Sequence, residues 1–380
     1  MGVLGGLELT AFGFFHLFRE RLGFFDLGDH LATLAARGAD PHELSRQALR
    51  FDPALGWDVA YDTAHGERPR ARDYGRPLVA TFGDSYTHCD QVGHDETWQT
   101  GLAELLQGDV YNFGISGAGP DQAYLKYVSL DPRPATPVVT LGIISENINR
   151  ILSVYRPFYY PRTGIRLTKP RFELVEGRLR LLENPIRSVD ELTRLSDPAF
   201  LARIGAHDDW YEQDDYPELG FPYLRILFNR RMWLELVYGR LVKGGVNDTN
   251  PTPWVDHWRD PEASALMFAI LDAFVAEATR EGQTPVLMLL PMEYQVVAMA
   301  RTGRSGISAA ALLEHCTARG YLCFDGVSAL ASRAGSPEAV KPLYHDHLTA
   351  LGNRWLAEAF ADFLRRVLAD RLDGQPGSAG

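Results

Sequence analysis

Ser85 and two histidines near the end of the chain are the residues whose types best fit nucleophilic chemistry. Ser85 lies in TFGDSYTHCD, directly after the apolar run PLVA, and His345 and His347 lie in YHDHLTALGN. A serine hydroxyl is a poor nucleophile until a base takes its proton, and histidine has a suitable pKa for that task. Taken alone, Ser85 would be an ordinary N-cap or turn hydroxyl.

Donors for an oxyanion are also present in the sequence. The tetrahedral intermediate of acyl transfer needs N–H groups directed at its negative oxygen. The backbone N–H of Ser85, a backbone N–H at Gly117 in NFGISGAGPDQ and the carboxamide of Asn147 in GIISENINR could supply them. Gly117 and Asn147 could also be present for reasons unrelated to catalysis, since glycine suits a turn with positive φ and asparagine suits a helix cap. Asp84 is expected to shape the loop around Ser85.

Short apolar runs bounded by polar loops must position these groups. Such runs predict strands that are buried on both faces of a parallel sheet. They cover residues 77–83, 109–115, 136–144, 284–292 and 321–327. Helical patterns lie between them, with N-caps expected at Asp95 and Thr349. This alternation predicts a doubly wound α/β sandwich, in which ligands bind beyond the carboxyl ends of the strands.

The sequence also predicts how the chain is divided. Residues 1–75 form an N-terminal helical and irregular extension, with a helical pattern in DPHELSRQALRF (residues 40–51). Residues 76–370 form the α/β domain, with an insert at about 151–260, and residues 371–380 form a flexible tail. Alternating segments around Glu176 and Gly177 predict a β-hairpin within the insert.

The insert is rich in aromatic residues, which could line an acceptor cleft or pack the insert's own core. They are Tyr155, Phe158, Tyr159, Tyr160, Trp210, Tyr211 and Trp233. Arg150 and Arg156 could bind an anionic group of a substrate or form solvated salt bridges.

Four blocks in a fixed order resemble the SGNH hydrolases, also called GDSL esterases and lipases. They are GDSYT after a strand, NFGISGAG, Asn147, and HLTALGN before the final helix. The resemblance runs from about residue 77 to 366, is weaker over the insert, and is closest to bacterial members with a large insert. It implies a flavodoxin-like three-layer α/β/α sandwich with a mainly parallel five-stranded sheet, and ester hydrolysis or O-acyl transfer. It also implies that Ser85 is the nucleophile, that His347 is the base, and that Ser85, Gly117 and Asn147 form the oxyanion hole.

The carboxylate that should support the histidine departs from the family pattern. The family places an aspartate three residues before the histidine, where this sequence has Tyr344. Asp346 is the nearest carboxylate, and it is adjacent to His347. Three readings stay open: Asp346 is a third catalytic member, no carboxylate supports a Ser–His dyad, or His345 replaces His347 as the base.

Composition excludes several classes of function. The chain has 380 residues and a net charge of −11, which argues against a nucleic-acid partner. Its three cysteines contain no CxxC pair, so neither a disulfide framework nor a zinc knuckle is predicted, and Cys89 reads as a small apolar residue. His88 and His94 have no acidic partners at metal-ligand spacing, and the sequence contains no phosphate-binding motif. We therefore expect no metal and no cofactor.

Residues 2–18 are almost entirely apolar. They predict a hydrophobic helix that either packs on the body of the protein or makes peripheral contact with a membrane. The segment lacks the basic region and the cleavage site of a secretory signal, so a cytoplasmic and a membrane-associated location both stay open.

The sequence therefore predicts a serine-dependent ester hydrolase that forms an acyl-enzyme on Ser85. Its expected substrate is a small acyl ester, with O-acetyl groups of a carbohydrate as one candidate. An O-acyltransferase that uses the same site and a catalytically silent binding protein on the same fold are the alternatives.

Overall fold

The computed structural model describes residues 2–22, 49–59, 61–160, 165–211, 220–228 and 257–372. The chain divides into two compact units. One contains the described residues of Met1–Trp57, Leu152–Arg171 and Glu183–Asn250, and the other those of Asp58–Ile151, Phe172–Leu182 and Pro251–Gly380. The domain boundaries expected from sequence stay a prediction, and the last eight residues of the expected tail lie outside the described part.

A five-stranded parallel sheet forms the centre of the second unit. Its strands are β3 (Pro77–Gly83), β4 (Asp109–Gly114), β5 (Val138–Ile143), β8 (Thr284–Leu289) and β9 (Leu322–Asp325). They lie in the order β4-β3-β5-β8-β9, and every neighbouring pair is parallel. All five predicted runs are strands, and their order is that of flavodoxin-like doubly wound sheets. The predicted fold class is confirmed.

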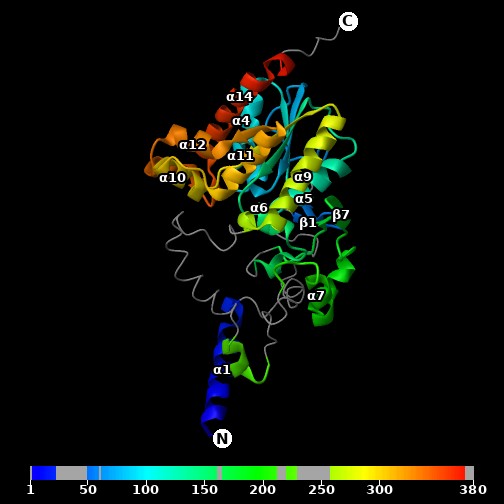
Figure 1. Ribbon diagram of the computed structural model, residues 1–380, viewed down its shortest axis with the longest axis vertical. Helices are drawn as coiled ribbons and strands as arrows, with labels where there is room; N and C mark the ends of the chain where they lie inside the picture. Colours follow the sequence, from blue (N-terminus) through cyan, green and yellow to red (C-terminus); the bar gives the residue numbers. More distant parts are fainter. Residues whose placement is uncertain are drawn as a thin grey trace. The chain divides into compact units, whose positions relative to one another are not determined.

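Helices cover both faces of this sheet, as Figure 1 shows. On one face, α4 (Trp98–Leu106) packs against α14 (Ala350–Leu372). On the other, α5 (Pro120–Ser129) packs against α9 (Pro261–Arg280). Every residue of β4 and β5 is buried between the two layers, which explains why both strands read as apolar runs.

One of the two predicted helix caps is correct. Thr349 Oγ1 accepts a hydrogen bond from Gly352 N at 3.3 Å, so Thr349 caps α14 as expected. The cap of α4 is Thr97, whose Oγ1 accepts from Thr100 N at 3.2 Å, and the prediction of Asp95 is wrong. Asp95 instead lies within a separate 3-10 turn, η1 (His94–Glu96), which the apolar spacing of α4 does not reveal.

Shorter elements complete this unit. They are α3 (Ser85–His88), α6 (Asn147–Ile151), β6 (Arg171–Val175), β7 (Arg178–Leu182), α10 (Glu293–Thr302), α11 (Ile307–Arg319), α12 (Gly326–Ala334), α13 (Pro337–Val340), η7 (Lys341–Leu343), β10 (Tyr344–His345) and β11 (His347–Leu348). β6 and β7 form the predicted hairpin, and both Glu176 and Gly177 have positive φ, 50° and 76°, as a type I′ turn requires.

The first unit is less regular. Its elements are α1 (Gly2–Leu22), β1 (Leu49–Asp52), β2 (Gly56–Val59), η2 (Arg156–Phe158), η3 (Val189–Ser196), α7 (Pro198–Gly205) and η5 (Tyr223–Phe228). The helical pattern expected over residues 40–51 is wrong where it can be compared, because residues 49–51 belong to β1, which pairs with β2. Glycine at position 56 lets the start of β2 lie close to the backbone at Thr168, because a Cβ there would lie 2.4 Å from Thr168 O.

Aromatic residues of the insert form a core within this first unit. Tyr155 and Phe158 are fully buried, with ring centroids 5.0 Å apart. Phe158 also contacts Tyr211, and Tyr159 contacts Trp210. This contact pattern favours the core reading over an acceptor cleft, although Tyr160 is exposed, and Trp233 lies outside the described residues.

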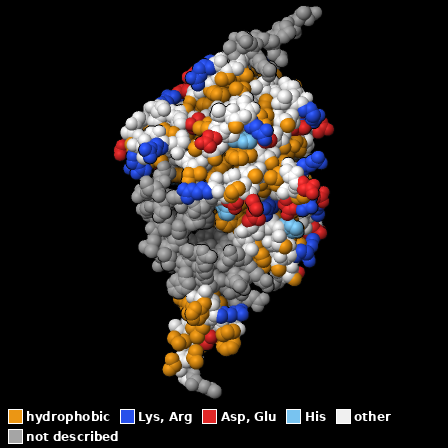
Figure 2. Space-filling view, viewed as in Figure 1, with side chains coloured by type: hydrophobic (Ala, Val, Ile, Leu, Met, Phe, Trp, Pro, Cys, Tyr) orange, Lys and Arg blue, Asp and Glu red, His pale blue; other side chains and the backbone are white. Residues whose placement is uncertain are grey.

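The apolar N-terminal segment is a helix, as predicted. In α1, Ala11 and Phe15 are buried, and the Glu8 carboxylate accepts a hydrogen bond from Tyr223 N at 2.7 Å. Many other apolar side chains of α1 are exposed, as Figure 2 shows: Val3, Leu4, Leu7, Leu9, Phe12, Phe14 and Leu17. Among the described helices, none has the length and apolar character needed to cross a membrane. Contact with a membrane surface stays a prediction.

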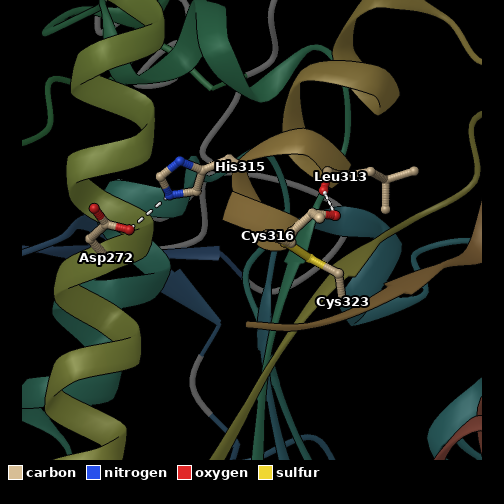
Figure 3. Close-up of a disulfide and its surroundings, with 6 residues drawn as sticks. Asp272, Leu313, His315, Cys316 and Cys323 are labelled. Carbon is tan, nitrogen blue, oxygen red and sulfur yellow. Dashed lines mark hydrogen bonds and ion pairs between the residues drawn. A yellow bond between two sulfur atoms is a disulfide. The ribbon is translucent and has the colours of Figure 1, made fainter. Parts of the chain in front are cut away.

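A disulfide joins Cys316 of α11 to Cys323 of β9, as Figure 3 shows. The expectation of no disulfide is therefore wrong. The two cysteines are seven residues apart, without a recognisable spacing motif, and only the packing of α11 beside β9 brings their Cα atoms to 6.2 Å. Next to Cys316, His315 Nε2 lies 2.8 Å from Asp272 Oδ1 of α9.

Candidate active site

Two close approaches of the backbone place Ser85 at the carboxyl end of the sheet. β3 ends at Gly83, and Ser85 begins the one-turn helix α3. A Cβ on Gly83 would lie 2.2 Å from Thr87 Oγ1, and a Cβ on Gly114 would lie 2.2 Å from His88 N. Glycine at both strand ends therefore lets α3 lie directly against β3 and β4. Ser85 itself is 6% exposed.

His347 contacts Ser85 directly. His347 Nε2 lies 2.8 Å from Ser85 Oγ, although the two residues are 262 positions apart in the sequence. His347 belongs to the small antiparallel pair β10–β11, in which it lies opposite His345. His345 is exposed, and no hydrogen bond joins it to Ser85. Of the two candidate bases, the structure brings His347 to the serine.

Asp346 lies beside His347 at the turn between β10 and β11. Its φ of 68° allows two consecutive side chains to approach each other, and Asp346 Oδ2 lies 3.3 Å from His347 Nδ1. The pair is within ion-pair distance, but its geometry is not that of a hydrogen bond, and the buried Nδ1 has no hydrogen-bond partner among the described residues. The Asp346 side chain is 78% exposed, so water screens its charge.

The position that carries an aspartate in the family pattern has a different task here. Tyr344 is buried, and its hydroxyl donates a hydrogen bond to Pro291 O at 3.0 Å. Its pKa is raised well above the ordinary value, because burial disfavours the phenolate and the charges of neighbouring groups add to the effect. Tyr344 therefore fixes the hairpin to the end of β8 and supplies no carboxylate.

Sequence reasoning missed Tyr86, which packs on the candidate base. The Tyr86 and His347 ring centroids lie 4.7 Å apart, and the Tyr86 hydroxyl lies 3.4 Å from Asp346 O. Burial, followed by the charges of Asp84 and Asp346, raises the pKa of Tyr86. Tyr86 directly follows Ser85, but nothing in the sequence indicates which way its ring points.

Asp84 holds the loop and the candidate oxyanion donor together. Its Oδ1 accepts from Tyr86 N at 2.9 Å, and its Oδ2 accepts from Asn147 Nδ2 at 2.9 Å and from Arg150 Nη1 at 3.2 Å. Burial raises the pKa of Asp84, while the charge of Arg150 and the hydrogen bond from Asn147 act against that rise. Asp84 is 1% exposed, so each of these contacts is made away from water.

Arg150 is neither solvated nor open to an anionic substrate group, contrary to both readings of the sequence. It is 5% exposed, and besides Asp84 it contacts Ala118 O at 2.8 Å and Glu146 at 3.4 Å. Because Ala118 lies in the loop after β4, Arg150 connects that loop to the loop that carries Ser85. This ion pair was hidden from sequence analysis because its members come from different strand ends.

Asn147 begins α6 with a fixed carboxamide. Its Oδ1 accepts from Ile144 N at 2.8 Å, which assigns Nδ2 to the side that faces Asp84. A carboxamide has two N–H bonds, so Asn147 Nδ2 keeps a second N–H besides the one that bonds Asp84, and the residue is fully buried. Gly117 lies in the turn after β4, with a φ of 74°. The structure thus places Ser85, Gly117 and Asn147 after β3, β4 and β5, three neighbouring strands.

The two histidines that follow Ser85 in the sequence, His88 and His94, each contact another side chain. His88 Nδ1 contacts Asp90 Oδ1 at 2.6 Å, and His94 Nδ1 accepts from Arg68 Nε at 2.9 Å. Within the described residues, no group of three or more His, Cys, Asp and Glu side chains could hold a metal ion. Cys89 is buried, and burial raises the pKa of its thiol to about 12.

Comparisons with known proteins add little to this geometry. The sequence matches no family model and no curated protein. Among solved structures, the chain is similar to a protein of Desulfitobacterium hafniense DCB-2 described as lipolytic and of the G-D-S-L family, with 11% identity and a TM-score of 0.36 over 76% of this chain and all of that one. It is also similar to a catalytic mutant of Axe2, an acetylxylan esterase from Geobacillus stearothermophilus, with 13% identity and a TM-score of 0.36 over 77% of this chain and 95% of that one. Likenesses with such low TM-scores do not support an assignment of function.

Proposed function

We propose that the protein is a serine-dependent ester hydrolase of the SGNH type. The observation that carries this proposal is the 2.8 Å contact between His347 Nε2 and Ser85 Oγ. A serine hydroxyl paired with an imidazole is the minimal arrangement of an activated oxygen nucleophile. Family membership is part of the proposal, and it rests on the four sequence blocks together with their meeting at one sheet edge.

In the proposed reaction, Ser85 Oγ attacks the ester carbonyl carbon while its proton moves to His347 Nε2. The carbonyl electron pair moves onto oxygen and forms a tetrahedral intermediate. Collapse of this intermediate expels the alcohol oxygen, which takes the proton from Nε2 and leaves an acyl group on Ser85. Water then attacks the acyl-enzyme in the same way, with His347 first as base and then as acid.

The oxyanion of each intermediate needs donors that are fixed before the reaction begins. The backbone N–H groups of Ser85 and Gly117 and the second N–H of Asn147 Nδ2 take this role in the proposal. Asp84 supports it indirectly, because it bonds both Tyr86 N, next to the nucleophile, and Asn147 Nδ2. Asp346 assists His347 only through a solvent-screened charge, so we describe the centre as a Ser–His dyad.

Labelling with a fluorophosphonate tests the proposal directly, since this probe forms a covalent adduct with activated serines. The wild-type protein should label at Ser85 and hydrolyse p-nitrophenyl acetate. Ser85→Ala should abolish the adduct, and His347→Ala should slow labelling by about 10³-fold or more, as loss of a catalytic base does.

Ser308→Ala is the matched control for the serine substitution. Ser308 of α11 is also buried, and it accepts a hydrogen bond from Gln295 Nε2 of α10 at 3.0 Å. This variant should label like the wild type. A folded wild-type protein without any adduct at Ser85 would instead favour the silent binding protein.

The proposal has two further parts, the identity of the acyl acceptor and the class of the substrate. Hydrolysis is proposed over acyl transfer because it needs no acceptor beyond water. An assay with an activated acetyl ester, with and without sugar acceptors, separates the two, since transfer would yield an acetylated sugar in place of acetate. Carbohydrate O-acetyl esters stay the expected substrate class, and the same assay tests them when acetylated sugars replace the activated ester.

A further inference from the structure

A buried chain of hydrogen bonds leads away from the turn that contains Gly117. Ser116 Oγ donates to Asp90 Oδ1 at 2.6 Å, and His88 Nδ1 lies 2.6 Å from the same oxygen. On the other side of the imidazole, His88 Nε2 lies 2.8 Å from Tyr61 Oη. Ser116 and His88 are 2% and 4% exposed and the Asp90 side chain is 7% exposed, whereas Tyr61, at the end of the chain, is half-buried. The proposed reaction uses none of these four side chains.

The direction of these bonds follows from the carboxylate. Burial alone would raise the pKa of Asp90, but hydrogen bonds from His88 and Ser116 and the charge of His88 lower it overall. An ionised carboxylate only accepts hydrogen bonds, so Ser116 O–H and His88 Nδ1–H both donate to Asp90. The bonds from Ser116 and His88 therefore both run toward Asp90, and a third hydrogen bond joins His88 Nε2 to the Tyr61 hydroxyl.

The segment that carries Asp90 is itself held in place by Arg68. The Arg68 guanidinium donates to Cys89 O at 3.0 Å and to Val92 O at 2.6 Å, on either side of Asp90. Arg68 is 6% exposed. Asp90 is therefore a fixed point from which the neighbouring loop can be positioned.

The turn that Asp90 holds is the one that orients the Gly117 N–H. Ala118 N donates to Ile115 O at 3.1 Å, which closes a turn with Ser116 and Gly117 at its centre. Gly117 has a φ of 74°, whereas Ser116 is not among the residues with positive φ, so the turn is of type II. Types I and II differ mainly by a flip of the central peptide, which here is the peptide that contains the Gly117 N–H.

We propose that Asp90, together with His88 and Ser116, is a positioning residue that fixes the Ser116–Gly117 peptide so that the Gly117 N–H faces the oxyanion. Anchoring the Ser116 side chain to a rigid carboxylate restrains the residue on one side of the flipping peptide. The glycine on the other side supplies the positive φ. This inference rests on the proposed function, because it assigns these residues a task only in acyl transfer.

The test compares Ser116→Ala, Asp90→Asn and Tyr61→Phe with the wild type. Ser116→Ala and Asp90→Asn should lower the rate constant of acylation by p-nitrophenyl acetate by about 10-fold to 10²-fold, which is less than the roughly 10²–10³-fold loss of a whole donor. KM should change little, because the oxyanion forms only in the transition state. Affinity for a trifluoromethyl ketone, whose tetrahedral adduct carries the oxyanion, should fall by the same factor as the rate. Tyr61→Phe should have a smaller effect in the same direction.

Ser308→Ala is again the matched control, since it removes a buried hydroxyl that takes no part in this chain of hydrogen bonds and should leave acylation and ketone affinity unchanged. Ser116→Thr, which restores the hydroxyl, should recover most of the acylation rate. If Asp90→Asn does not fold, the acylation rates and ketone affinities of Ser116→Ala and Tyr61→Phe test the inference.

Folded Ser116→Ala protein that acylates and binds the ketone like the wild type would overturn the inference, and so would a rise in KM without a fall in the acylation rate. In either case the wild type still acylates, so the proposed function survives. A wild type that forms neither an acyl-enzyme nor a fluorophosphonate adduct would remove both.

Discussion

The phenol ring of Tyr86 lies against the imidazole of His347, with the ring centroids 4.7 Å apart. His347 thus contacts both an aromatic ring and Ser85 Oγ. In a triad with a buried carboxylate, that carboxylate orients the imidazole. In the proposed dyad the carboxylate is exposed, so we expect packing by Tyr86 to orient the imidazole in its place.

Tyr86→Ala should therefore impair both stability and catalysis. Removing a buried aromatic ring typically costs about 3–5 kcal/mol of unfolding free energy, and a freed imidazole would lower the acylation rate by roughly 10-fold. Tyr86→Phe keeps the ring and loses only a hydroxyl contact of 3.4 Å to Asp346 O, which is too long to be strong. This second variant should acylate within about threefold of the wild type. Urea denaturation and single-turnover acylation measure the two effects, and a Tyr86→Phe variant as slow as Tyr86→Ala would contradict the role of packing.

Asp346→Asn should have only a small effect on the rate. Exposed ion pairs are typically worth about 0.2–1 kcal/mol, which corresponds to a change of roughly fivefold at most. Raising the salt concentration should shrink even this difference, because the carboxylate is 78% exposed. Steady-state hydrolysis by the variant at low and high salt is the measurement. A loss near 10⁴-fold, as seen when a triad aspartate is replaced, would show instead that Asp346 sets the tautomer of His347.

The strands of the sheet could be predicted from the sequence because each is marked by a short run of consecutive apolar residues. Each of the five strands lies in an apolar run. In β3, β4, β5 and β8 nearly every residue is buried, so no alternation of apolar and polar residues obscures the pattern, whereas β9 is mostly half-buried. Ser85, Gly117 and Asn147 could be located for the same reason, since each follows a strand end. The parallel topology then brings them to one edge.

The contacts that orient these residues could not be read in the same way. Arg150 meets Asp84 across 66 residues, and Ser116 meets Asp90 across 26, so neither pair has a spacing that a sequence pattern could reveal. The disulfide was missed because cysteine spacing is informative only for known motifs. Asp95 was a plausible cap by residue type, but it lies in the 3-10 turn η1, and Thr97, which directly precedes α4, is the cap.

Alkylation with iodoacetamide should reveal one free thiol, that of Cys89, and one disulfide, between Cys316 and Cys323. In denaturant without a reductant, iodoacetamide should add to Cys89 alone, whereas after reduction all three cysteines should react. In the native protein Cys89 should also resist alkylation, because it is buried with a thiol pKa of about 12 and the reactive thiolate is absent near neutral pH. Mass spectrometry of the alkylated chain gives the counts, and three modified cysteines before reduction would rule out the bond between Cys316 and Cys323.

Asp90 should contribute to stability in a pH-dependent manner with a definite sign. Its pKa in the folded protein is lowered below the ordinary value of 3.8, because the bonds and charge of His88 and the bond from Ser116 outweigh the effect of burial. The folded state therefore binds the Asp90 proton less readily than the unfolded state does. The stabilisation is fully present above the ordinary pKa and is lost as the pH falls through that value and then through the folded pKa.

The difference in unfolding free energy between the wild type and Asp90→Asn should consequently narrow as the pH is lowered from about 6 to about 3. Urea titrations of both proteins across this range measure it. Asp95→Asn is the control, because Asp95 is exposed in the neighbouring turn, and its difference from the wild type should stay small throughout. A gap for Asp90→Asn that widens in acid would mean that the folded protein holds this carboxyl in its protonated form, and Ser116 would then lack the ionised acceptor that anchors its turn.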